Sequence, residues 1–113
     1  MSHRSHWIGV NTTDKKQNYY GCGLAMTHSS AYLLMNLDKE LRTEILQELF
    51  GANGARLSIV RIPIGASDYV ETDEFFTCDD IDISTDANAT DMNLEHFSIK
   101  NDSNIIAVMK EIY

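Results

Sequence analysis

The stretch GCGLAMTHSSAY, residues 21–32, joins two glycines to a histidine and several hydroxyl side chains. Three interpretations are open: a phosphate cradle, a strand-to-helix turn at a catalytic site, or a structural turn. A dinucleotide fingerprint needs a third glycine where Met26 stands, and a P-loop needs a lysine that is absent. The nucleophile pattern G-x-S-x-G is also absent, and adjacent residues such as His28 and Ser29 do not face each other on a helix. Phosphate binding and a serine–histidine dyad are therefore excluded.

The residues around this stretch predict a strand followed by helix. Residues 19–26 are apolar with two glycines, which favours a buried strand. From Ser29 onward the apolar residues recur every three or four positions. This spacing predicts one helical face, which consists of Leu34, Leu37, Leu41, Ile45 and Leu49. Asp38 can cap a helix that begins at Lys39, so two helical segments joined at residues 37–38 are expected. Gly51 is expected to end the second one as a left-handed C-cap.

The segment LSIVRIPIG, residues 57–65, predicts a second strand buried on both faces, over residues 57–62. Pro63 has no amide donor, so pairing should stop near it. Residues 66–104 show no periodicity, and an apolar stripe at Ile105, Val108, Met109 and Ile112 predicts a last helix with Asp102 or Ser103 as its cap. The order predicts an α/β fold made of βα units with parallel strands. Two such units do not close a barrel, and the last stripe still runs at Tyr113, so we expect a piece of a larger domain.

Charge excludes some classes of partner. The chain has 113 residues and a net charge of −8, and ten of its seventeen acidic residues lie between Arg61 and Lys100, where no lysine or arginine occurs. Such a surface repels nucleic acid and anionic lipid. No apolar run is long enough to cross a bilayer, and no signal peptide is visible. The two cysteines form neither a disulfide framework nor a zinc pattern; free thiols are expected, with one bridge left open.

Four segments together resemble the opening of a glycoside hydrolase family 30 catalytic domain: GCGLAMTHSSAYLL (21–34), LFGANGARLSIVRIPIGASDY (49–69), FTCDDIDIS (76–84) and LEHFSIKNDSNIIAVMKEI (94–112). The glucosylceramidase and β-1,6-glucanase branch is the most similar. The resemblance implies a (β/α)8 TIM barrel, incomplete in this chain, with residues 19–113 as its N-terminal part. Residues 1–18 are then an N-terminal segment that belongs to a flanking β-domain.

The same resemblance implies retaining hydrolysis of a β-glucoside such as glucosylceramide or a glucan, with no metal or other cofactor. It implies a lysosomal or secreted location, and transient access to membrane lipid for the full-length protein. The segment at residues 80–84 lacks the glycine and glutamate of an EF-hand calcium loop, so no metal site is expected there.

Two residues are candidates for substrate binding. Strand alternation places Val60 and Ile62 toward the covering helices, and Arg61 on the inward side with Leu57 and Ile59. Burying the charge of an inward arginine costs free energy unless a carboxylate pairs with it. The resemblance places Arg61 beside the catalytic nucleophile. Asp68 matches an aspartate that hydrogen-bonds sugar hydroxyls. The plainer alternatives are a buried ion pair for Arg61 and a loop cap for Asp68.

No catalytic carboxylate is expected within the chain. Retaining hydrolysis needs two carboxylates about 5–5.5 Å apart, and the family carries them on later strands. The loop residues Glu71, Glu74, Asp79 and Asp80 match neither role. The chain alone is therefore expected to be inactive.

One departure from the family pattern stands at His28, where the family usually has aspartate. A carboxylate suits a helix N-terminus, whereas histidine caps poorly. Either Thr27 or Ser29 takes over the cap, or the chain is a truncated copy that no longer catalyses and at most binds carbohydrate or a partner protein. Glycosylation sequons at Asn11, Asn88 and Asn101 matter only if the protein is secreted.

Overall fold

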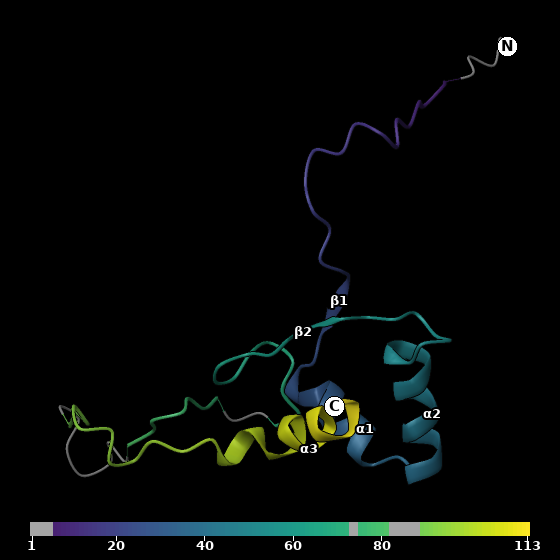
Figure 1. The fold of residues 1–113 in the computed structure, drawn as a ribbon. Helices are drawn as coiled ribbons and strands as arrows, with labels where there is room; N and C mark the ends of the chain where they lie inside the picture. Colours follow the sequence, from purple (N-terminus) through teal and green to yellow (C-terminus); the bar gives the residue numbers. More distant parts are fainter. Residues whose placement is uncertain (1–5, 73–74, 82–88) are drawn as a thin grey trace, which may run out of the picture.

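The computed structural model describes residues 6–72, 75–81 and 89–113 (Figure 1). The order of its elements is β1 (Gly23–Ala25), α1 (His28–Met35), α2 (Lys39–Phe50), β2 (Ile59–Arg61), the 3₁₀ turn η1 (Lys100–Asp102) and α3 (Ser103–Ile112). Residues 6–18 are exposed, contain no helix or strand, and run away from the other elements (Figure 1). Their place in a flanking β-domain stays a prediction. Glu74, Asn88 and residues 82–84 lie outside the described residues.

The two strands pair in parallel, as the βα order predicts. Gly23 lies opposite Ile59, and Ala25 lies opposite Arg61. The pairing extends one residue beyond β1, where the amide of Met26 donates to the carbonyl oxygen of Arg61 at 2.8 Å. The expected strands over residues 19–26 and 57–62 are too long, because only three residues of each have strand geometry.

Backbone geometry on both sides of the pair explains why the strands are short. Gly21 has a φ of +136° and Arg56 a φ of +55°, and neither value occurs in a regular strand. The amide of Leu57 donates to the carbonyl oxygen of Leu49 at the end of α2, and so turns away from β1. After β2, Pro63 offers no amide, so pairing ends near it as expected.

The helical region is split where Asp38 predicts it. Thr27 is the N-cap of α1, and its hydroxyl accepts from the amide of Ser30 at 3.2 Å. Asp38 is the N-cap of α2, although its side chain makes no capping hydrogen bond. The expected left-handed cap at Gly51 is wrong: its φ is −66° with extended ψ. Glycine fits there for another reason, since a Cβ would collide with the carbonyl oxygen of Gln47.

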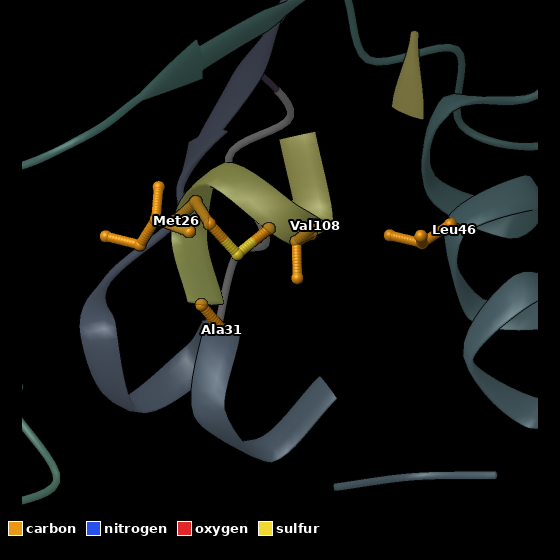
Figure 2. Close-up of a cluster of buried hydrophobic side chains, with 5 residues drawn as sticks. Met26, Ala31, Leu46 and Val108 are labelled. Atoms are coloured by element: carbon orange, nitrogen blue, oxygen red, sulfur yellow. The ribbon is translucent and has the colours of Figure 1, made fainter. Parts of the chain in front are cut away.

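A small core lies between the strand pair, α1, α2 and α3. Its buried apolar side chains are Met26, Ala31, Leu46, Ile105 and Val108. Met26 and Ala31 lie against Val108 of α3, and Leu46 points toward them from α2 (Figure 2). The stripe expected on α3 is confirmed at Ile105 and Val108, which are buried, and at Met109 and Ile112, which pack against the core.

The buried face of α2 differs from the predicted one. Leu41 is 46% exposed, whereas Arg42 and Leu46 are buried. The break at residues 36–38 restarts the helix at Lys39, so the periodicity of α1 does not continue in phase through α2. The buried Arg42 pairs with Glu111 of α3 through two hydrogen bonds, of 2.8 and 3.0 Å. An ion pair therefore joins α2 to α3 at the edge of the core.

The two faces of β2 differ as strand alternation predicts within the strand itself. Val60 packs against the core, and Ile59 and Arg61 are exposed on the other side. The expectation fails just outside the strand. Leu57 lines a hollow on the helix side with Phe50 and Ile112, and Ile62 is half-exposed. Alternation holds only where the backbone is extended, and β2 is three residues long.

Candidate substrate-binding site

A hollow of about 180 Å³ opens where the two parallel strands end. Its walls come from the end of β1, the end of β2 and the loop that follows β2. The lining residues are Ala25, Thr27, Arg61, Pro63, Ser67, Asp68 and Tyr69. The structure thus brings together both residues that the sequence predicts as substrate-binding, Arg61 and Asp68. The ends of parallel strands are where α/β barrels bind their ligands.

Arg61 is the last residue of β2 and is exposed. Its backbone is held by the pairing with Ala25 and by the hydrogen bond from Met26. Among the described residues, no carboxylate forms an ion pair with its guanidinium. The alternative of a buried ion pair is therefore not observed within the part of the chain that the structure describes, where the guanidinium remains open to a partner at the hollow.

Asp68 lies in a loop whose backbone is tied at both ends. Gly65 turns the chain with a φ of +76°, and the amide of Ala66 donates to the carbonyl oxygen of Phe76 at 2.9 Å. On the other side of Asp68, the carbonyl oxygen of Tyr69 accepts from the amide of Ser29 at 3.1 Å. These bonds fix the loop against α1 and against the segment that contains Phe76.

The carboxylate of Asp68 has no hydrogen-bond partner within the described part of the chain, and the residue is exposed. The capping role belongs to its neighbour instead, since the hydroxyl of Ser67 accepts from the amide of Tyr69 at 3.3 Å. The alternative of a loop cap for Asp68 is therefore not observed. Its acceptor oxygens are free for a ligand with hydroxyl groups.

His28 begins α1, directly after Thr27 of the lining, and is 2% exposed. Its Nε2 donates to Oδ1 of Asp102 at 2.8 Å, and its ring meets Phe76 edge to face at a centroid distance of 5.0 Å. Its Nδ1 is buried and has no hydrogen-bond partner among the residues that the structure describes. Thr27 takes over the helix cap, as one of the two expectations for this position states. His28 is a packed residue with a charged partner, not a free base.

In the acidic loop, the segment between Arg61 and Lys100, several of the described carboxylates accept hydrogen bonds from nearby residues of the same segment. The carboxylate of Asp91 accepts from the amide of His96 at 2.7 Å and contacts Nδ1 of the same residue at 2.9 Å. The backbone amides of His96 and Glu95 lower the pKa of Asp91 to about 2. Burial, and then the neighbouring Asp91, raise the pKa of Asp79. Asp80 accepts hydrogen bonds from the amide and hydroxyl of Thr77, the shorter backbone one at 2.8 Å. These carboxylates organise the loop, and none lines the hollow.

Several features of the site were missed by the sequence analysis. Ser67 and Tyr69 flank Asp68, and that adjacency is a signal that could have found them. Thr27 lies just past β1, at the position where the end of a parallel strand predicts a site. No local signal predicts that Asp102 is the partner of His28, because 74 positions separate them.

The described residues contain no group of three or more His, Cys, Asp or Glu side chains arranged to hold a metal ion. Cys22 is exposed, Cys78 is partly buried, and both are free thiols. In the searched part of the chain, every helix is too short or too polar to cross a membrane.

Comparison with known proteins places the fold in a wider context. A family model described as the glycosyl hydrolase family 30 TIM-barrel domain matches residues 19–111. A Caenorhabditis elegans protein, "Putative glucosylceramidase 3", is 30% identical over 92 residues, which are 81% of this chain and 16% of that protein. A solved endo-β-1,6-glucanase matches with a TM-score of 0.69 and 29% identity, over 90% of this chain and 20% of that one. The chain thus spans only a small part of each relative.

Proposed function

Because this chain belongs to glycosyl hydrolase family 30 and folds as part of its TIM barrel, we propose that it forms one side of the glucose-binding site of a retaining β-glucosidase. The family and barrel fold expected from the sequence motifs are confirmed by these comparisons. The proposal concerns the substrate and the roles of individual residues.

The observation that carries the proposal is the hollow shared by Arg61 and Asp68. Both residues lie at or just beyond the end of β2, and both have polar groups without partners among the described residues. In TIM-barrel enzymes the active site is built from the loops at this end of the strands. Two unpaired polar groups at this position are better suited to a ligand than to holding the loop, which backbone bonds already hold.

We assign a different role to each residue. The carboxylate of Asp68 accepts hydrogen bonds from glucosyl hydroxyl groups, because an ionised carboxylate is an acceptor at both oxygens. The guanidinium of Arg61 faces a carboxylate supplied by the remainder of the barrel, since five fixed donors suit bidentate pairing with such a group. That carboxylate is the nucleophile of the retaining mechanism, which needs a second carboxyl group about 5–5.5 Å away.

The names of the two relatives support the proposed class of substrate. One is named for glucosylceramide and the other for a β-1,6-glucan, so a glucosyl group is shared and the leaving group differs. We propose a β-glucoside, with glucosylceramide as the substrate of the glucosylceramidase type. Access to a lipid aglycone then requires surfaces outside this chain.

A non-catalytic copy that only binds carbohydrate is the competing function. The reason to consider it was histidine at position 28, and the structure provides this residue with a partner in Asp102. We therefore keep the enzyme as the proposal. The described residues supply no carboxylate pair in the hollow, so we expect the chain to bind a glucoside and to hydrolyse none.

The test compares Asp68→Asn with Glu71→Gln, which neutralises an exposed carboxylate in the same loop outside the hollow. Methyl β-D-glucoside is titrated into the full chain, and amide chemical shifts of residues 61–69 are followed. We expect Asp68→Asn to weaken binding about tenfold or more, because a charge-assisted hydrogen bond is lost, and Glu71→Gln to bind as the unchanged chain does. Equal binding by all three would overturn the assignment of Asp68, and turnover of an aryl β-glucoside by the chain alone would overturn the location of the catalytic carboxylates.

A further inference from the structure

His28 follows Thr27, which lines the hollow, and the contact of His28 with Asp102 joins the start of α1 to the start of α3. We infer that the contact of His28 with Asp102, called the clasp below, holds in place the loop that carries Asp68, called the rim of the hollow. His28 is then a positioning residue for glucosyl binding that does not touch the sugar. The inference rests on the proposed function for its effect on the ligand. Its structural part, the control of the rim by the clasp, stands on the contacts alone.

Three connections lead from His28 to the residues that line the hollow. Thr27, the preceding residue, is itself part of the lining. The next residue, Ser29, donates its amide to the carbonyl oxygen of Tyr69 at 3.1 Å. The ring of His28 packs against Phe76, whose carbonyl oxygen accepts from the amide of Ala66 at 2.9 Å. The loop that contains Asp68 is therefore bounded on both sides by groups that His28 holds in place.

Asp102 makes its contact in place of its usual helix-capping role. It occupies the N-cap position of α3, where an aspartate normally accepts from amides of its own helix. No capping hydrogen bond is made by its side chain. Its carboxylate accepts from Nε2 of His28 instead. Asp102 thus bonds to His28 of another helix and does not cap α3 with its side chain.

The ring of His28 depends strongly on that contact. It is buried, and its Nδ1 already has no partner, which costs free energy. Without Asp102 both ring nitrogens would be buried and unpaired. The ring is then expected to leave its place against Phe76, and the amide of Ser29 to lose its fixed position relative to Tyr69.

The pair of Arg42 and Glu111 offers a matched control. It also joins α3 to an earlier helix, with a shortest distance of 2.8 Å, but it ties α2 to the opposite end of α3. Neither residue lines the hollow. Breaking this pair removes a comparable contact of α3 and leaves the clasp intact.

The experiment measures hydrogen exchange at the amide of Ser29 in the full chain and in the variants Asp102→Ala, Asp102→Asn and Glu111→Ala. We expect exchange to rise about tenfold in Asp102→Ala, because a buried charge-assisted hydrogen bond is removed. Asp102→Asn keeps an oxygen acceptor for Nε2 and should restore most of the protection. In Glu111→Ala the exchange rate of the Ser29 amide should stay within about twofold of the rate in the unchanged chain. Equal rates in Asp102→Ala and Glu111→Ala, or an unprotected Ser29 amide in the unchanged chain, would overturn the clasp.

A second measurement links the clasp to the ligand. Affinity for methyl β-D-glucoside should fall about tenfold in Asp102→Ala, recover in Asp102→Asn and stay unchanged in Glu111→Ala. An affinity that falls in both alanine variants alike reports general destabilisation and overturns the positioning role. If the unchanged chain binds no glucoside, the proposed function fails, and the exchange rates still decide whether the clasp controls the rim.

Discussion

Nε2 of His28 lies 2.8 Å from Oδ1 of Asp102, although 74 positions separate the two residues in the chain. This contact changes the interpretation of the most unusual residue in the opening stretch. An aspartate at position 28 would bring a second carboxylate toward Asp102. Histidine suits this place, because its ring N–H can donate to a carboxylate.

The contact predicts the effect of placing a second carboxylate at position 28. In His28→Asp, two carboxylates face each other in a poorly solvated site, so repulsion should lower the Tm by about 5 °C or more. The double variant His28→Asp with Asp102→Asn should recover at least half of the loss, because one charge is removed. Thermal unfolding followed by circular dichroism measures both. A single variant as stable as the unchanged chain would show that the positions are not coupled.

The ion pair of Arg42 and Glu111 predicts a dependence of stability on pH. The guanidinium of Arg42 lowers the pKa of Glu111 below its usual value. A carboxyl group whose pKa is lower in the folded state stabilises the fold at neutral pH, and the effect is lost as pH falls through the folded pKa. Glu111→Gln should therefore be less stable than the unchanged chain at pH 7, and the difference should shrink toward pH 3. Urea unfolding of both proteins across this range measures it, and a difference independent of pH would contradict the charge-based cause.

The low pKa of Asp91, about 2, predicts how the acidic loop responds to substitution. Its carboxylate holds the amides of His96 and Glu95, so Asp91→Ala should speed hydrogen exchange of the His96 amide about tenfold. Asp91→Asn keeps one acceptor oxygen, so its exchange rate at the His96 amide should lie between those of the unchanged chain and Asp91→Ala. In the unchanged chain the protection should persist at pH 4 and fade only near pH 2, because the carboxylate stays ionised until then. Loss of protection already near pH 4 would be inconsistent with the lowered pKa.

The second glycine of the opening stretch is required by a close approach of two backbones. A Cβ on Gly23 would collide with the carbonyl oxygen of Ile59 in the paired strand. Gly23→Ala should therefore lower the free energy of unfolding by about 1–3 kcal/mol, as overpacking does elsewhere. Gly9→Ala is the control, since nothing lies within 4 Å of its added Cβ, and its effect should stay below about 0.5 kcal/mol. Chemical denaturation of the two variants compares them directly, and equal stability would argue against the parallel pairing.

Much of the local structure could be predicted from the sequence. The split between the helices at residues 37–38 and the stripe on α3 follow from spacing and side-chain chemistry within a few residues. For the cap of α1 the sequence left Thr27 and Ser29 as alternatives, and the structure selects Thr27. Arg61 and Asp68 were predicted because their segment resembles that of glycoside hydrolase family 30, and the structure places both at one hollow. Their roles in sugar binding stay predictions.

The predictions that failed depend on the exact backbone conformation at the ends of elements. The strands are shorter than predicted because Gly21 and Arg56 adopt positive φ values next to them. The buried face of α2 is shifted because the helix restarts at Lys39. Apolar spacing records which residues prefer burial, and it does not record where a strand stops or with which phase a new helix begins.

The sequence by itself therefore determined the family, the α/β class and the two candidate binding residues, because motifs and periodicities are local properties of the chain. Only the tertiary structure decided that His28 pairs with Asp102 and Arg42 with Glu111, across 74 and 69 positions. Such pairs depend on how three helices pack around one small core. The sequence around a polar side chain does not indicate which distant residue will contact it in the folded protein.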